Sequence, residues 1–125
     1  MNRDRRKALA AVQTNLESLT SFIVNEMERD EGSIEDAKQK IEGVKSDIET
    51  LRDEEQDYFD SMPENMQSGD KGSMAEEAVS QLDEALSKME EIVEKLDALI
   101  TALAELAEIE GYTEEVVSYI DQACA

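Results

Sequence analysis

The side chains best suited to chemistry in this sequence are its carboxylates. Glu54 and Asp57 form one close pair, and Glu91, Glu94 and Asp97 form a second group. Carboxylates that converge from facing helices hold Mg²⁺ in all-helical enzymes that hydrolyse nucleotide pyrophosphates. Such a site requires that the acids point into the space between the helices, so the apolar residues around them decide whether it can form.

Those apolar residues place the acids outside the core. Leu82, Met89, Leu96 and Leu103 recur every seven residues, and further apolar residues follow each of them after three and four positions. Three apolar positions in each heptad are typical of a helix that faces a bundle core. In this frame the acids among residues 90–97 fall outside the apolar face. The sequence therefore favours a solvated acidic face over a metal site.

Other catalytic chemistry lacks its residues. The chain has no histidine, which excludes catalytic triads, imidazole bases and histidine-containing metal sites. The single cysteine, Cys124, forms neither an internal disulfide nor a thiolate metal site, and it suits a reducing compartment. Glycine-rich phosphate loops and EF-hand spacing are also missing from the sequence. We predict a protein that is not an enzyme and that uses no cofactor and no metal.

Two segments are candidates for binding. The first seven residues, MNRDRRK, contain a basic cluster that could contact an anion or simply balance nearby acids; its members are Arg3, Arg5, Arg6 and Lys7. The second is EEQDYFDSMPENMQSGDKG, residues 54–72, whose exposed candidates for partner contact are Tyr58, Phe59, Glu64, Asn65, Gln67 and Lys71. This segment is either a recognition site or a cap that closes a helical hairpin and fixes its register.

Periodicity and capping signals predict four helices, at about 4–29, 34–61, 73–110 and 114–124, with a loop over 62–72. Ser73 and Glu76 form a capping box at the start of the third helix, and Gly111 is a typical C-terminal stop at its end. Pro63 ends the second helix. The second helix has a narrow apolar seam of coiled-coil type, and Glu55 occupies the seam position where the next apolar residue is expected. We interpret this seam carboxylate as a residue that fixes the register of the helices.

The junction between the first two helices, residues 30–33, has two interpretations. Gly32 could end the first helix, with Ser33 and Asp36 capping the next. A continuous helix with a four-residue stutter is the alternative, and we favour the break.

The predicted fold class is all-α and a single domain spans residues 1–125. An antiparallel hairpin of the second and third helices carries an extra N-terminal helix and a short C-terminal helix. Because this arrangement leaves apolar surface uncovered, we expect a homodimer to complete the bundle.

The charge is large and uneven. The net charge is −20; the first seven residues carry +3, whereas from Asp53 onward three basic groups face 21 acids. Such a surface repels nucleic acid and anionic lipid and attracts basic protein patches. We expect no direct DNA or RNA binding by the acidic body. The sequence also lacks a signal peptide and a membrane-spanning stretch, which predicts a cytoplasmic protein.

The acidic aromatic turn EEQDYFDSMPENMQSGDKG, the following helix MAEEAVSQLDEAL and the basic start MNRDRRK resemble a group of small acidic proteins encoded by phages and prophages. The resemblance covers about residues 45–100 and the basic start. It implies a viral or prophage origin and a bacterial host cytoplasm, and it brings no assigned catalytic or binding residues. This chain has more helix around 24–44 and a longer C-terminus than the group.

Three functions fit these observations. The first is an interaction protein that binds a basic host protein, with its acidic surface acting as a nucleic-acid mimic or in an anti-defence role. The second is a structural protein that assembles by helical self-association. The third is a binder of a small nucleotide ligand through Arg5, Arg6 or Tyr58. We favour the first, because dense negative charge on rigid helices suits a basic protein surface.

Overall fold

The computed structural model describes residues 1–124, and its ordered elements are all helices. They are α1 (Arg3–Asn25), α2 (Glu31–Asp60), α3 (Glu64–Gln67) and α4 (Asp70–Cys124). The predicted all-α class is therefore confirmed. Within the described residues, every helix is too short or too polar to cross a membrane.

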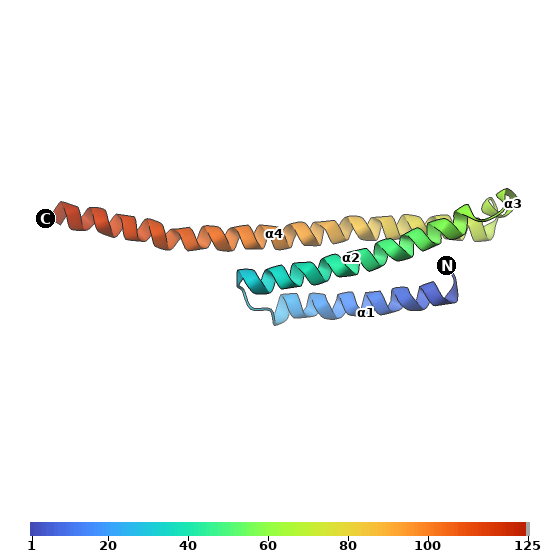
Figure 1. Ribbon diagram of the computed structural model, residues 1–125, viewed down its shortest axis with the longest axis horizontal. Coiled ribbons are helices and arrows are strands. Elements are labelled where there is room, and N and C mark those ends of the chain that lie inside the picture. Colours follow the sequence, from blue (N-terminus) through green and yellow to red (C-terminus); the bar gives the residue numbers. More distant parts are fainter. Residues whose placement is uncertain (125) are drawn as a thin grey trace.

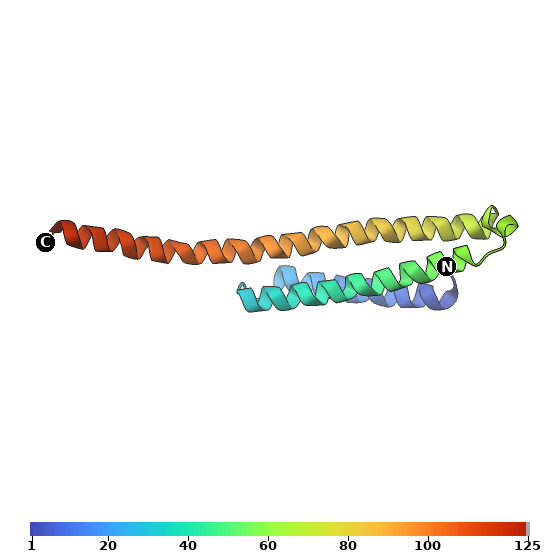
Figure 2. The ribbon, with the colours of Figure 1, turned by 45° about the horizontal axis from the view of Figure 1, so that its top comes forward.

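The helices lie side by side in an elongated molecule (Figure 1). α4 runs along its whole length, α2 lies against α4 in the opposite direction, and α1 folds back along α2. The view turned by 45° shows the same neighbours (Figure 2). Because α1 and α2 are much shorter than α4, they cover only its first part, and the C-terminal part of α4 projects beyond them.

The core lies between α2 and α4. α2 buries a residue every three or four positions, namely Ile34, Ala37, Ile41, Val44, Ile48 and Leu51. The buried residues of α4 that face them are Ala75, Val79, Leu82, Met89 and Leu96. α1 buries no residue fully. Its half-buried residues Leu9, Val12, Leu16, Leu19 and Ile23 pack on this core from one side. Removal of these apolar faces from water is the main force that holds the three helices together.

The break between the first two helices lies slightly earlier than predicted. α1 ends at Asn25 rather than at residue 29, and α2 begins at Glu31 rather than at residue 34. Asp30, not Ser33, is the N-cap of α2: its carboxylate accepts from the Ser33 amide at 2.7 Å and from the Ser33 hydroxyl at 2.9 Å. Glu26 is the C-cap of α1, and its amide donates to the Phe22 carbonyl at 2.8 Å.

The predicted stop at Gly111 and the separate helix over 114–124 are wrong. α4 is one helix of 55 residues that passes through Gly111. No glycine of the described chain has the positive φ of a left-handed helix end. A glycine inside a helix costs only about 1 kcal/mol relative to alanine. This single penalty is too small to end the helix, so α4 continues through Gly111.

The turn between α2 and α4 is shorter than the predicted loop over 62–72. α3 follows Pro63 directly, and α4 begins at Asp70, so Ser73 lies inside the helix instead of capping it. Gly72 is buried where α4 passes the backbone of Gln67, and an added Cβ would overlap the Gln67 carbonyl oxygen. Because α3 approaches α4 so closely here, position 72 has no room for a side chain larger than that of glycine.

Candidate functional site

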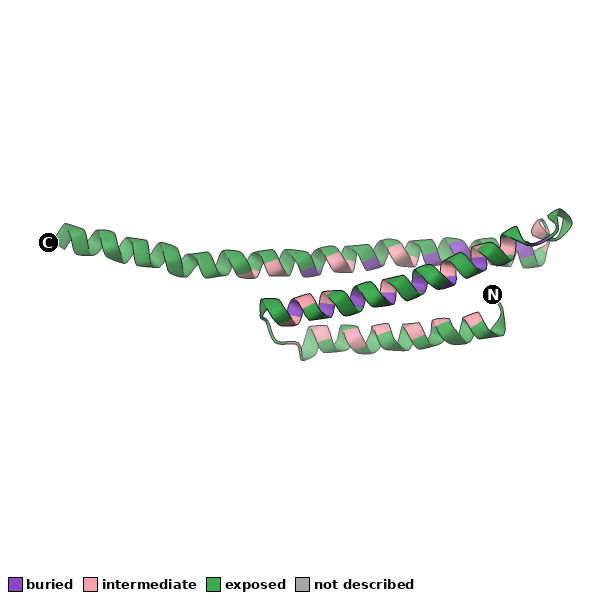
Figure 3. Ribbon diagram, in the orientation of Figure 1, coloured by how far each residue is buried: buried purple, intermediate pink, exposed green. Residues whose placement is uncertain are grey.

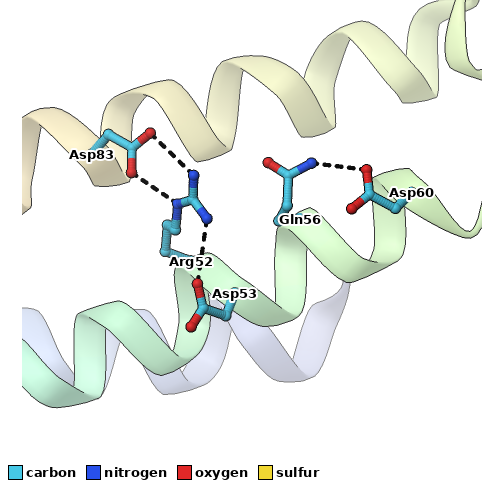
Figure 4. A network of polar contacts seen from close by, with 5 residues as sticks. All are labelled: Arg52, Asp53, Gln56, Asp60 and Asp83. Atoms are coloured by element: carbon cyan, nitrogen blue, oxygen red, sulfur yellow. Dashed lines mark hydrogen bonds and ion pairs between the residues drawn. The ribbon is translucent and has the colours of Figure 1, made fainter.

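The clearest polar feature is a series of ion pairs that crosses from α2 to α4. The pairs are Arg52–Asp83, Lys45–Glu90 and Lys38–Asp97, with nitrogen–oxygen distances of 2.8, 3.3 and 2.7 Å. We call this set the ion-pair ladder. Figure 4 shows its Arg52 end, where the guanidinium contacts both carboxylate oxygens of Asp83 and also Asp53. The partners recur every seven residues on both helices, so the ladder runs beside the apolar seam of the antiparallel pair.

The ladder also explains the state of the carboxylates that could have served a metal. The hydrogen bond that Lys38 donates to Asp97 raises the pKa of Lys38. The bond that Arg52 donates to Asp83 likewise raises the pKa of Arg52. Glu91 pairs with Lys88 on its own helix at 3.2 Å. In the part of the chain that the structure describes, no three acidic or thiol side chains gather as a metal site requires.

Glu55, the one polar residue of the α2 seam, is fully buried. Arg5 Nε donates to Glu55 Oε2 at 2.9 Å, and the Met1 amino group lies 3.1 Å from Glu55 Oε1. The Arg5 guanidinium also lies over the Tyr58 ring, 5.2 Å from its centre. A buried carboxylate requires such cationic partners. This site joins the start of α1 to the end of α2. That Glu55 fixes the register of the helices stays a prediction.

The predicted anion contacts therefore separate into two groups. Arg5 contacts Glu55, so an outside anion would have to compete with a buried carboxylate of the same chain. Arg3, Arg6 and Lys7 are exposed on α1.

The candidate recognition segment, residues 54–72, also divides. The Gln67 side-chain amide donates to the Phe59 carbonyl at 3.1 Å, and Met62 is buried, so these residues hold the turn together. Glu64, Asn65 and Lys71 remain exposed, and Tyr58 is partly covered by Arg5. The tip of the hairpin thus contains structural contacts beside three free polar side chains.

The largest uncovered surface lies elsewhere, on the C-terminal part of α4. Every residue from 104 to 124 is exposed, and Leu103 is the last half-buried residue of the helix (Figure 3). We call residues 104–124 the arm. At 1.5 Å per residue it is about 30 Å long. Large apolar side chains occur along it, and they include Leu106, Ile109, Tyr112, Val116, Val117, Tyr119 and Ile120.

The charges of the arm are all of one sign. It carries six acids, namely Glu105, Glu108, Glu110, Glu114, Glu115 and Asp121, and the last basic residue of the chain is Lys95. No ion pair reaches these acids from the rest of the described chain. Three acids of the α4 body are paired with bases of α2, whereas within the described chain no acid of the arm is paired and the arm also has uncovered apolar groups.

Comparisons with models of protein families, with curated proteins and with solved structures find no match for this chain. The arm, the hairpin tip and the charge distribution are therefore the features that bear on function. Sequence reasoning missed the arm because it placed a helix stop at Gly111. It also missed the ladder, although the spacing of seven between Lys38, Lys45 and Arg52 was a usable signal.

Proposed function

We propose that this chain is a non-catalytic phage or prophage protein that binds a basic host protein through its acidic helical surface. The observation that carries this proposal is the arm, where six carboxylates lie among exposed apolar side chains without a basic residue. Apolar surface of this extent on a rigid helix is typical of interaction sites. The resemblance of residues 45–100 to small phage and prophage proteins supports the assignment of origin.

The electrostatics favour a basic partner. Like charges on the arm raise the local negative potential, which attracts a cationic surface and accelerates its association. In the body of the molecule, each acid of the ladder obtains a base from α2. Basic side chains of a partner would pair with the acids of the arm in the same way. Binding should therefore weaken as salt screens the charges.

Helical self-association is the second candidate, because the exposed apolar residues of the arm could also pack against a second copy in a homodimer. Two arms would bring twelve acids together without a base, and such an assembly should strengthen with salt. The nucleotide-binding function is less well supported, since Arg5 is bound to the buried Glu55 and lies over the Tyr58 ring.

Affinity capture from bacterial lysate tests the proposal. The full chain is immobilised and washed at about 50 mM and about 500 mM NaCl, and retained proteins are identified and purified for direct titration. We expect a basic protein that is retained at low salt and released at high salt. A variant with Glu108, Glu114, Glu115 and Asp121 changed to amides should lose it. The proposal is wrong if retention is equal at both salt concentrations.

The matched control removes the same charge from the body. Glu54, Glu76, Glu77 and Glu84 are exposed on α2 and α4 and belong to no ion pair of the described chain. Their change to glutamine should leave capture nearly unchanged if the arm is the contact. Equal loss in both variants would assign the binding to overall charge.

A further inference from the structure

Resting on that proposed function, we propose a specific docking mode: one face of the arm receives an amphipathic helix of the partner, which carries Lys or Arg along both edges of its apolar face. The partner is thus defined by its chemistry as a basic amphipathic helix of about 20 residues, since the arm is about 30 Å long.

The apolar part of this surface is a stripe. Leu106, Ile109, Tyr112, Val116 and Ile120 follow one another at intervals of three or four residues, which places them on one helix face. All five are more than half exposed, with fractions of 56% to 62%. We call them the arm stripe. Intervals of three and four residues are those of a helix face that packs on another helix, so the stripe suits a helix rather than a sheet edge or a flat surface.

Acids border the stripe on both sides. Glu108 and Glu115 lie seven residues apart along one edge, and Glu114 and Asp121 lie seven residues apart along the other. Residues separated by seven positions lie almost above one another on a helix. A partner helix with basic residues at the same interval can therefore form two rows of ion pairs around an apolar seam.

α2 shows how this same helix binds such a partner. It lies antiparallel to α4, buries Ile34, Ile41 and Ile48 at intervals of seven, and places Lys38 and Lys45 against acids of α4. The arm continues α4 beyond the start of α2, but in the frame of the body its ladder positions are Ala104, Gly111 and Ser118. The arm instead has its own apolar stripe with acids on both sides, and a basic amphipathic helix would complement it as α2 complements the body.

A groove at the base of the arm extends the docking surface toward the body. It has a volume of about 560 Å³, and its apolar lining includes Ile23, Val24, Met27, Leu99 and Leu103. It lies where the turn between α1 and α2 meets α4, next to the start of the arm stripe. One end of the docked helix can insert an apolar side chain there.

A second copy of the chain fits this surface less well. Two arms packed together would place rows of carboxylates beside each other, and like charges across a helical interface are unfavourable. The arm has no basic residue that could form a cross-pair. Charge complementarity thus selects a basic partner over self-association.

The test uses three synthetic peptides of 21 residues and the full chain. The first carries leucine at the two seam positions of each heptad and lysine at the flanking positions. The second has the same composition in a scrambled order, and the third has glutamine in place of lysine. Binding is measured by fluorescence anisotropy at about 50 mM and about 500 mM NaCl. We expect only the first peptide to bind well, with one peptide per chain and at least tenfold weaker binding at high salt.

Two double variants locate the contact. Ile109→Gln with Val116→Gln alters the arm stripe, and Met66→Gln with Met74→Gln removes two exposed aliphatic side chains outside the stripe and outside the groove at its base. Glutamine retains good helix propensity, so the arm should stay helical, which circular dichroism verifies. The stripe variant should bind the first peptide at least tenfold more weakly, and the control should stay within about twofold of wild type.

Three results would overturn the docking mode. One is equal affinity of wild type and stripe variant. Another is equal binding of the scrambled peptide. The third is a wild-type dimer that strengthens with salt and is lost in the stripe variant, since a second copy would then cover the stripe. Salt-sensitive capture of a basic host protein that survives in the stripe variant would leave the proposed function standing while removing this docking mode.

Discussion

Lys38 of α2 lies 2.7 Å from Asp97 of α4, and this contact is the last rung of the ion-pair ladder before the arm begins. On the body side of this pair, acids of α4 meet bases of α2 at intervals of seven residues. Beyond it the next ladder position of α4 is Ala104 and α2 begins at Glu31, so the ladder stops at this pair. The arm that follows carries acids but no bases.

The ladder should behave as a register device. Lys38→Glu places two negative charges opposite each other and should lower the melting temperature slightly, since the pair is partly solvated. Adding Asp97→Lys should recover most of that loss, because the exchanged pair restores attraction. Thermal denaturation of the single and double variants at low salt measures the coupling. An additive loss in the double variant would show that the contact does not contribute to the register.

The contact between Arg5 and Glu55 should contribute far more. Arg5→Met leaves a buried carboxylate without its main partner and should cost about 3 kcal/mol of unfolding free energy, near the low end for a broken buried pair. Arg5→Met with Glu55→Ile replaces the pair by apolar groups that continue the seam, so stability should return to about the wild-type value. Urea denaturation measures both.

Arg3 provides the control for that experiment. It is exposed on the same helix, and Arg3→Met should change stability by less than about 0.5 kcal/mol. The interpretation of Glu55 fails if Arg5→Met is no more destabilising than Arg3→Met.

Gly72 and Gly43 should respond in opposite ways to alanine. At Gly72 the new methyl group would overlap the Gln67 backbone, so Gly72→Ala should destabilise the protein by about 1–3 kcal/mol. At Gly43 no atom lies within 4 Å of the added Cβ, so Gly43→Ala should stabilise it by about 0.4–1 kcal/mol. Urea midpoints compare the two. A harmless Gly72→Ala would contradict the close packing of α3 on α4.

The cap at Asp30 gives a defined pH dependence. Hydrogen bonds from Ser33 hold the pKa of Asp30 below its ordinary value of 3.8. A lowered pKa in the folded state means that the carboxylate stabilises α2 fully above about pH 4, and this stabilisation is lost as the pH falls through the folded-state pKa. The melting temperature of Asp30→Ala should therefore lie below that of wild type by a constant amount at pH 5–8. The difference should shrink below about pH 4, and a constant difference down to pH 2.5 would contradict the charged cap.

The sequence predicted the parts of the fold that depend on local pattern. The intervals of seven between Ile34, Ile41 and Ile48, and between Leu82 and Met89, identified the two seams that form the core. These patterns are local because each helix buries one face, whatever partner covers it.

Two kinds of feature were not predicted: contacts between residues far apart in the sequence, and outcomes that depend on small energy differences. The pairing of Arg5 with Glu55 joins residues 50 positions apart, and nothing in either segment alone indicates it. Gly111 was interpreted as a helix end because glycine is common there, yet the penalty inside a helix is small enough for α4 to continue. That one interpretation concealed the arm, which is the main candidate for partner binding.

Hydrogen exchange resolved along the chain, with and without the basic amphipathic peptide, tests the central claim most directly. In the free protein, amides of residues 104–124 should exchange fastest among the helices, because no other helix covers the arm. Added peptide should slow exchange across the arm and the groove at its base, and leave the hairpin tip at 62–69 unchanged. Protection confined to the tip, or absent from residues 104–124 when the peptide is bound, would contradict the account.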